Sequence, residues 1–203
     1  MRLFHLSDLH IGKRVNEFSM IEDQKYILER ILDLAEKEMP DGVILAGDIY
    51  DKQIPSAEAV QVFDEFITKL AERKFPIFVI SGNHDSAERL AFGGRLLNSR
   101  GIYLSPVYDG TVMKIPIADQ YGTVWIHLLP FIRPAAVRRV FEDESDLITD
   151  VQSAVRAVIS HMEIDPNERN ILVAHQFVTG ASRCESEDIQ VGGLDNIDAS
   201  VFE

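Results

Sequence analysis

The segment from Pro76 to Asp85 constrains the fold more than any other part of this sequence. Its first half, Pro-Ile-Phe-Val-Ile, is a continuous apolar run that predicts a strand buried on both faces of a sheet. Its second half, Ser-Gly-Asn-His-Asp, is abruptly polar. Ligands of open α/β sheets bind beyond the carboxyl ends of the strands. The polar half therefore indicates either a metal site or a turn that caps the next helix, and this segment alone favours neither.

Three other apolar runs end in the same way, at residues able to bind a metal. They are residues 2–6, 43–46 and 170–174, followed by Asp8 and His10, by Asp48 and by His175. The spacing of two between Asp8 and His10 predicts that both side chains face the same way from an extended segment. Because one such strand end is common and four are not, we expect these residues to converge on one rim of a sheet.

Helical periodicity separates these strands. It predicts helices over 19–38, from Ser56 to about 73, from Ser86 to about Ser99, and from about Ser145 to Met162. Ser19 and Glu22 have the spacing of a capping box. Residues 101–132 contain strand-like runs at 112–115 and 123–129, which predict a second, partly antiparallel sheet. The sequence therefore predicts an α/β fold.

The composition limits the kinds of molecule that this chain is expected to bind. The 203 residues carry a formal net charge of −13, which argues against a generic nucleic-acid binder unless bound cations supply the positive charge. Cys184 is the only cysteine, so an intrachain disulfide is excluded. No apolar run approaches the roughly 18 residues of a spanning helix. We expect a cytoplasmic protein without a membrane partner.

Four motifs in order resemble the calcineurin-like metallophosphoesterase superfamily: Asp8-Leu-His10-Ile-Gly12, Gly47-Asp48-Ile-Tyr-Asp51, Gly82-Asn83-His84-Asp85 and Ala174-His175. Two further stretches, 129–134 and 178–181, are similar to the bacterial SbcD nuclease family. The resemblance implies a four-layer α/β/β/α sandwich of two mixed sheets flanked by helices, with residues 1–203 forming one metallophosphoesterase domain.

The resemblance also implies a site for two divalent metal ions. It assigns Asp8 and His10 to one ion, Asn83 and His175 to the other, and Asp48 to a bridge between them. A mixture of imidazole, carboxylate and amide-oxygen ligands suits Mn²⁺ better than Mg²⁺, which is kept as the alternative.

Two more residues complete the implied site. His84 would bind no metal and would act on the phosphate, by stabilising charge or by protonating the leaving oxygen. Asp51 is the candidate for orienting His84, with a solvated loop carboxylate as the alternative.

The activity implied by the resemblance is metal-dependent hydrolysis of DNA phosphodiesters at ends and hairpins. The family works as a homodimer with an SbcC-like ATPase of the SMC type, and apolar faces of the helices at about 56–73 and 87–99 are candidates for the dimer contact. Two alternatives stay open. One is a phosphoesterase acting on small-molecule or protein phosphoesters, and the other is a non-catalytic scaffold for dimerisation.

The sequence departs from the superfamily pattern after His175. The superfamily closes its site with Gly-His-x-His, one histidine for each metal, and no histidine follows His175. We therefore expect a domain that is incomplete at its C-terminal end and that, as it stands, binds metal weakly, holds one ion or is inactive.

Overall fold

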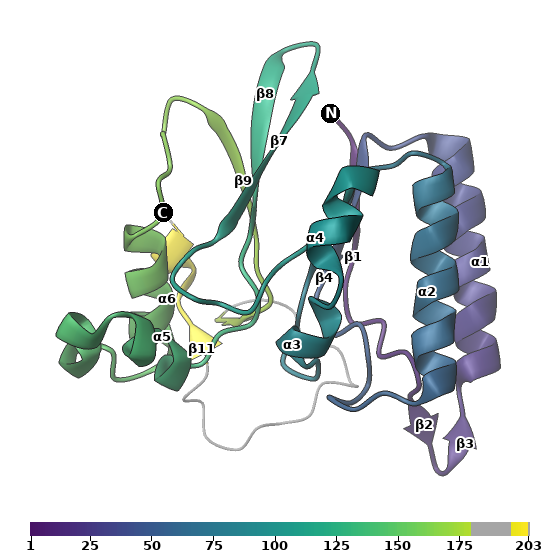
Figure 1. Ribbon diagram of the computed structural model, residues 1–203, viewed down its shortest axis with the longest axis horizontal. Helices are drawn as coiled ribbons and strands as arrows, with labels where there is room; N and C mark the ends of the chain where they lie inside the picture. Colours follow the sequence, from purple (N-terminus) through teal and green to yellow (C-terminus); the bar gives the residue numbers. More distant parts are fainter. Residues whose placement is uncertain (180–195, 203) are drawn as a thin grey trace.

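The computed structural model describes residues 1–179 and 196–202. Cys184, Gly192, Gly193 and the Gly180-Ala181 end of the motif that starts at Val178 lie outside these residues. The described elements form four layers, with helices on each side of two facing sheets (Figure 1). This arrangement confirms the predicted α/β/β/α layer order.

The first sheet consists of four parallel strands. Their order is β1 (Leu3–Leu6), β4 (Gly42–Ala46), β5 (Ile77–Ile80) and β6 (Ile102–Leu104). The two central strands are buried at every residue, as their apolar runs predicted. We expected a mixed sheet, but every pairing among these strands is parallel. Each connection contains a helix, and such a crossover returns the chain in the same direction.

The second sheet is mixed, as predicted. Strands β7 (Met113–Asp119) and β8 (Gly122–Leu128) form an antiparallel hairpin, and β9 (Arg169–Val173) pairs with β8 in parallel. Two smaller pairs complete the described strands. They are the hairpin of β2 (Arg14–Val15) and β3 (Phe18–Ser19), and the parallel pair of β10 (Phe177–Val178) and β11 (Asn196–Ile197).

Helices cover the outer faces of both sheets. On the first sheet, α1 (Ile21–Glu38) and α2 (Ala57–Glu72) lie side by side, and the short elements α3 (Ala87–Leu90), α4 (Gly94–Leu97) and η1 (Asn98–Arg100) connect β5 to β6 (Figure 1). The second sheet is flanked by α5 (Pro134–Val140), η2 (Glu142–Leu147), α6 (Val151–Ser160) and η3 (Ala199–Phe202). Among the described residues, no helix is both long enough and apolar enough to cross a membrane.

The predicted capping box at Ser19 is wrong. Ser19 pairs with Arg14 in the β2–β3 hairpin, and α1 begins at Ile21 without a side-chain cap. The sequence signal failed because the hairpin places the serine in a strand two residues before the helix.

Two other predicted helices are shorter than expected. Ser86 caps α3 as predicted, but Gly93 adopts a left-handed φ of 76° and separates α3 from α4. The helix expected from Ser145 begins only at Val151, where Asp150 and Ser153 form a capping box. The preceding segment, Glu142–Leu147, forms the 3₁₀ helix η2 instead. Because the N-cap residue Asp150 has an extended backbone, an α-helix cannot continue through it from the residues before.

Three apolar clusters hold the four layers together. Leu28, Leu32, Phe63 and Phe66 pack α1 and α2 on the first sheet, and Val137, Val155 and Val158 pack α5 and α6 on the second. The middle cluster lies between the sheets and includes Ile44, Phe78, Ile80, Ile126 and Leu128. Because β8 and β9 pack on β4 and β5 through this cluster, the ends of strands from both sheets are held near one another.

Phe78→Ala should lower the free energy of unfolding by about 3–5 kcal/mol. Phe78 is fully buried between the sheets and stacks on Tyr103 with ring centroids 5.5 Å apart. Urea denaturation monitored by circular dichroism measures the change. Phe18→Ala is the matched control because Phe18 is 77% exposed, and it should change stability by less than about 0.5 kcal/mol. Equal unfolding midpoints for the two variants would show that the inter-sheet cluster is not tightly packed.

Candidate metal centre

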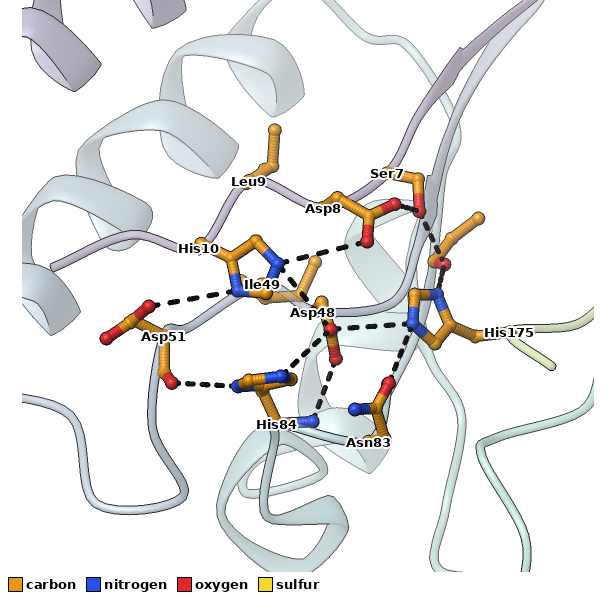
Figure 2. Close-up of polar contacts among 12 residues, drawn as sticks. Ser7, Asp8, Leu9, His10, Asp48, Ile49, Asp51, Asn83, His84 and His175 are labelled. Atoms are coloured by element: carbon orange, nitrogen blue, oxygen red, sulfur yellow. Dashed lines mark hydrogen bonds and ion pairs between the residues drawn. The ribbon is translucent and has the colours of Figure 1, made fainter. Parts of the chain in front are cut away.

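Side chains from four strand ends surround the carboxylate of Asp48 (Figure 2). Asp8 and His10 follow β1, Asp48 follows β4, Asn83 and His84 follow β5, and His175 follows β9. Parallel strands end at the same edge of their sheet, and the inter-sheet packing brings the end of β9 to that edge. The structure therefore brings together the residues that the sequence analysis selected as metal ligands.

Asp48 lies at the centre of the group and is 3% exposed. Its Oδ2 is 3.5 Å from His175 Nε2, 3.7 Å from His10 Nε2 and 4.0 Å from His84 Nε2. The backbone N–H of His84 donates to Oδ1 at 2.9 Å. One carboxylate thus faces three imidazoles.

Asp8 and Asn83 extend the group on either side of Asp48. Asp8 Oδ1 is 3.9 Å from His10 Nε2, and Asn83 Oδ1 is 3.2 Å from His175 Nε2. Two sets of possible ligand atoms lie within 4.8 Å of one another: those of His10, Asp48 and His84, and those of Asp8, Asp48 and His175. Asp48 belongs to both sets, but these sets group His84 with His10 and Asp8 with His175, which differs from the assignment that the resemblance implies.

The donor set fits divalent cations. The carboxylates of Asp8 and Asp48 have oxygen atoms within 4.8 Å of each other, so their charges repel. In residues 1–179 and 196–202, no Lys or Arg side chain forms an ion pair with either carboxylate. Imidazole, carboxylate and amide-oxygen ligands together are typical of sites for transition-metal ions such as Mn²⁺.

Burial and charge shift the pKa of each central group. Burial lowers the pKa of His10 and outweighs the opposing attraction of Asp48, so this imidazole favours the neutral form that binds metals. Burial alone would raise the pKa of Asp48, but its interactions with His175 and the His84 N–H lower the pKa overall. Burial disfavours the protonated form of His175, but the contact with Asp48 outweighs this effect and raises the pKa of His175 above its usual value.

Backbone contacts orient two of the histidines. His175 Nδ1 donates to the carbonyl of Ala46 at 2.7 Å, which directs Nε2 toward Asp48. His84 Nδ1 donates to the backbone carbonyl of Asp51 at 3.1 Å. The contact that orients His84 therefore involves the main chain of Asp51, whereas its carboxylate lies 4.0 Å from His10 Nδ1.

The segment from Asp8 to His10 is not extended, contrary to the prediction. Strand β1 ends at Leu6, and Asp8 and His10 have left-handed φ angles of 56° and 43°. Their N–H groups donate to the carbonyls of Gly47 and Asp48, which hold this unfavourable backbone in place. The two side chains do lie together, but the left-handed backbone at Asp8 and His10, and not strand alternation, brings them there.

Asp85 is a positioning residue that the sequence analysis did not identify. Its carboxylate is 6% exposed and accepts N–H groups from Gly82 at 2.9 Å, Ile49 at 3.1 Å and Tyr50 at 2.9 Å. Burial raises its pKa despite these three bonds. They join the loop after β4 to the loop after β5. Its place directly after the two site residues Asn83 and His84 was the available signal, but a helix-capping Asp has the same sequence appearance.

Two glycines allow the close approach of these loops. A Cβ on Gly47 would lie 2.6 Å from the ring of His175, and one on Gly82 would lie 2.1 Å from Asp48 Oδ1. Both distances are shorter than any real carbon contact. Glycine is therefore required at both positions if Asp48, Asn83 and His175 are to meet.

Comparison with known proteins agrees with this geometry. The family model for calcineurin-like phosphoesterases matches residues 1–195. The chain is 34% identical over 206 aligned residues to the SbcD subunit of nuclease SbcCD from Staphylococcus saprophyticus subsp. saprophyticus, and the match covers 100% of this chain and 53% of that protein. The corresponding protein of Staphylococcus epidermidis is also 34% identical, with 100% and 54% covered. The chain spans about half the length of these relatives.

A solved structure of YfcE, a phosphoesterase from E. coli, is more distant. It shares 14% sequence identity with this chain, with a TM-score of 0.32 over 63% of this chain and 56% of that one.

Gly82→Ala should weaken Mn²⁺ binding by at least about tenfold, because the new methyl group would displace the carboxylate of Asp48. Isothermal titration calorimetry with MnCl₂ measures the affinity. Gly94→Ala is the matched control, since its Cβ would make an ordinary 3.5 Å contact with Leu104. Unchanged Mn²⁺ affinity in folded Gly82→Ala would contradict a metal centre at Asp48.

Proposed function

The chain belongs to the calcineurin-like phosphoesterase family, and we propose that it is the catalytic domain of a metal-dependent DNA nuclease of the SbcD type. The observation that carries the proposal is the convergence of carboxylate, imidazole and amide ligands on Asp48. The similarity, over the full length of this chain, to two proteins named as nuclease subunits supports DNA as the substrate.

In this proposal, Asp8 and His10 hold one divalent ion, Asn83 and His175 hold a second, and Asp48 contacts both. Mn²⁺ is the ion that the mixed donor set favours. When bound, such a pair of cations activates water and stabilises the charge that develops on the phosphoryl oxygens. Cations at this position also reconcile phosphate binding with the net charge of −13.

His84 is proposed to act on the phosphate. Its side chain is 41% exposed, more than those of His10 at 19% and His175 at 14%, so it faces the opening of the site. The bond from Nδ1 to the Asp51 carbonyl leaves Nε2 directed toward the site. From there Nε2 can stabilise developing charge or, when protonated, give a proton to the leaving oxygen.

The proposal includes two protein partners, a second copy of this chain and an SbcC-like ATPase of the SMC type. Exposed apolar side chains between α3 and α4, on α4 and in the first turn of α2 support a dimer contact. Phe92 is 86% exposed, Leu96 is 80% exposed and Val60 is 45% exposed. Large apolar side chains exposed on neighbouring elements are typical of an interaction surface.

In the full-length protein, His84→Ala should reduce Mn²⁺-dependent release of nucleotides from linear DNA by about 10²–10⁴-fold, because the group that stabilises charge or protonates the leaving oxygen is lost. Its bound Mn²⁺, measured by mass spectrometry of the metal, should not change. His161→Ala is the matched control, since His161 lies at the end of α6 and contacts Glu144.

Retained nuclease activity in His84→Ala would refute the role of this residue, and lost metal would make it a ligand. Hydrolysis of p-nitrophenyl phosphoesters by the wild type without hydrolysis of DNA would favour the small-molecule alternative. Absence of bound metal from the full-length protein would favour the scaffold.

In the full-length protein, Asp48→Ala should abolish binding of both ions together, because its carboxylate lies 3.7 Å from His10 Nε2 and 3.5 Å from His175 Nε2, which are proposed ligands of different ions. Metal titration followed by electron paramagnetic resonance of Mn²⁺ counts the ions that remain. Asp33→Ala removes an exposed carboxylate on α1 and should leave the metal content unchanged. Loss of a single ion from Asp48→Ala would exclude the bridging position.

A further inference from the structure

Gln24 is a polar residue on the buried face of α1. The buried side chains of this helix are Ile21, Leu28, Leu32 and Ala35, and Gln24 lies three residues after the first and four before the second. At this helical spacing Gln24 belongs to the face that packs on the first sheet, and it is half-buried. An amide removed from water needs hydrogen-bond partners within the protein. The partners of Gln24 therefore indicate its role.

The amide of Gln24 makes three hydrogen bonds to segment 9–12, which follows β1. Its Oε1 accepts the N–H of Gly12 at 2.9 Å, and its Nε2 donates to the carbonyls of Leu9 at 3.1 Å and His10 at 2.8 Å. The reverse orientation would place the amide NH₂ against the N–H of Gly12, so these contacts identify the oxygen and the nitrogen. One side chain of α1 thus holds both ends of the segment that carries His10.

The three bonds require the particular chemistry of an amide. They need one acceptor and two donors at the end of a single side chain. An ionised carboxylate has no donor, an ammonium group has no acceptor, and the amide of asparagine is one methylene group nearer to the backbone. Glutamine at position 24 is therefore matched to the main chain of segment 9–12.

The backbone that Gln24 binds is strained. His10 has a left-handed φ of 43° and is bonded from two directions, because its N–H donates to the carbonyl of Asp48 at 2.9 Å and its carbonyl accepts from Gln24. The N–H of Ile11 also donates to the carbonyl of Ile49 at 2.9 Å. Such a conformation of a non-glycine residue persists only where the surrounding structure imposes it. The loop after β4 supplies one half of that restraint, and α1 supplies the other.

The imidazole of His10 extends from this segment into the metal centre. Its Nε2 lies 3.7 Å from Asp48 Oδ2 and 3.9 Å from Asp8 Oδ1. The position of a ligand depends on its backbone, and groups that orient a ligand contribute strongly to metal affinity. His175 is oriented in another way, by the bond from its Nδ1 to the carbonyl of Ala46. The two proposed ions therefore depend on different supporting contacts.

Building on the proposed metal site, we propose that Gln24 is a positioning residue that fixes His10 for the ion assigned to Asp8 and His10. It acts through the main chain of segment 9–12 and contacts neither substrate nor metal. Loss of its amide should therefore weaken one ion and spare the ion assigned to Asn83 and His175. In this role α1 supports the chemistry of the site besides covering the first sheet.

Titration of the full-length protein with Mn²⁺, followed by electron paramagnetic resonance, tests the proposal. Gln24→Met keeps the length of the side chain and removes the three bonds. It should weaken binding of one of the two ions about 10- to 100-fold and change the other by less than about twofold. Gln24→Glu keeps the acceptor but loses both donors, so it should weaken the same ion. Gln61→Met is the matched control, since Gln61 is exposed on α2 and contacts Glu65.

A double-mutant cycle with His10→Ala separates positioning from a general loss of stability. In the His10→Ala protein, Gln24→Met should have no further effect on Mn²⁺ binding, because the ligand that it positions is absent. Hydrogen exchange of the Gly12 N–H needs no metal, and it should be at least about tenfold faster in Gln24→Met than in the wild type. Thermal unfolding of each variant shows whether the protein is folded.

Equal weakening of both ions in folded Gln24→Met would overturn the positioning role, and so would an undiminished effect in the His10→Ala background. If the wild type binds two ions and Gln24→Met binds both as tightly, the role of Gln24 fails while the proposed metal site stands. If the full-length wild type binds no Mn²⁺, the proposed metal site fails and the role of Gln24 fails with it.

Discussion

The carboxylate of Asp85 joins two of the loops that carry the metal centre. It accepts three backbone N–H groups, from Gly82, Ile49 and Tyr50, and so joins the loops after β4 and β5. A buried carboxylate is costly unless hydrogen bonds satisfy it, and here the bonds come from the two loops that must stay together. Asp48 on one loop and Asn83 on the other are thereby held at a defined separation.

The loops that carry the metal centre lie very close together, and parts of their backbone are strained. Gly47 and Gly82 leave no room for a Cβ, and Asp8, His10 and Asp48 all have left-handed φ angles. Such conformations cost free energy and persist where the surrounding structure requires them, as at binding and catalytic sites. The apolar cores on both sides of the two sheets compensate for this cost.

The layered packing explains why the site also has a neighbouring cavity. The second sheet contributes His175 through β9 and the segment 129–133 through β8, and both are bonded to the ends of strands in the first sheet. Where the two sheets meet, the imidazole of His175 reaches Asp48, and a cavity lies beside Asn83. The metal ligands and the neighbouring cavity are thus both products of the same contact between sheets.

Sequence patterns are sufficient to locate the strands and the side chains that surround Asp48, because buried strands are apolar and ligands follow their ends, whereas the layer order came from the resemblance to a known family. The same patterns misplace Ser19 and miss Asp85, and they do not show that the contact of Asp51 with His84 is made by its carbonyl. Backbone conformation and main-chain hydrogen bonds depend on neighbours distant in sequence, as with His175 and Ala46, which are 129 residues apart. Residue types and order thus identify the chemistry, whereas packing of the two sheets sets the distances at which that chemistry operates.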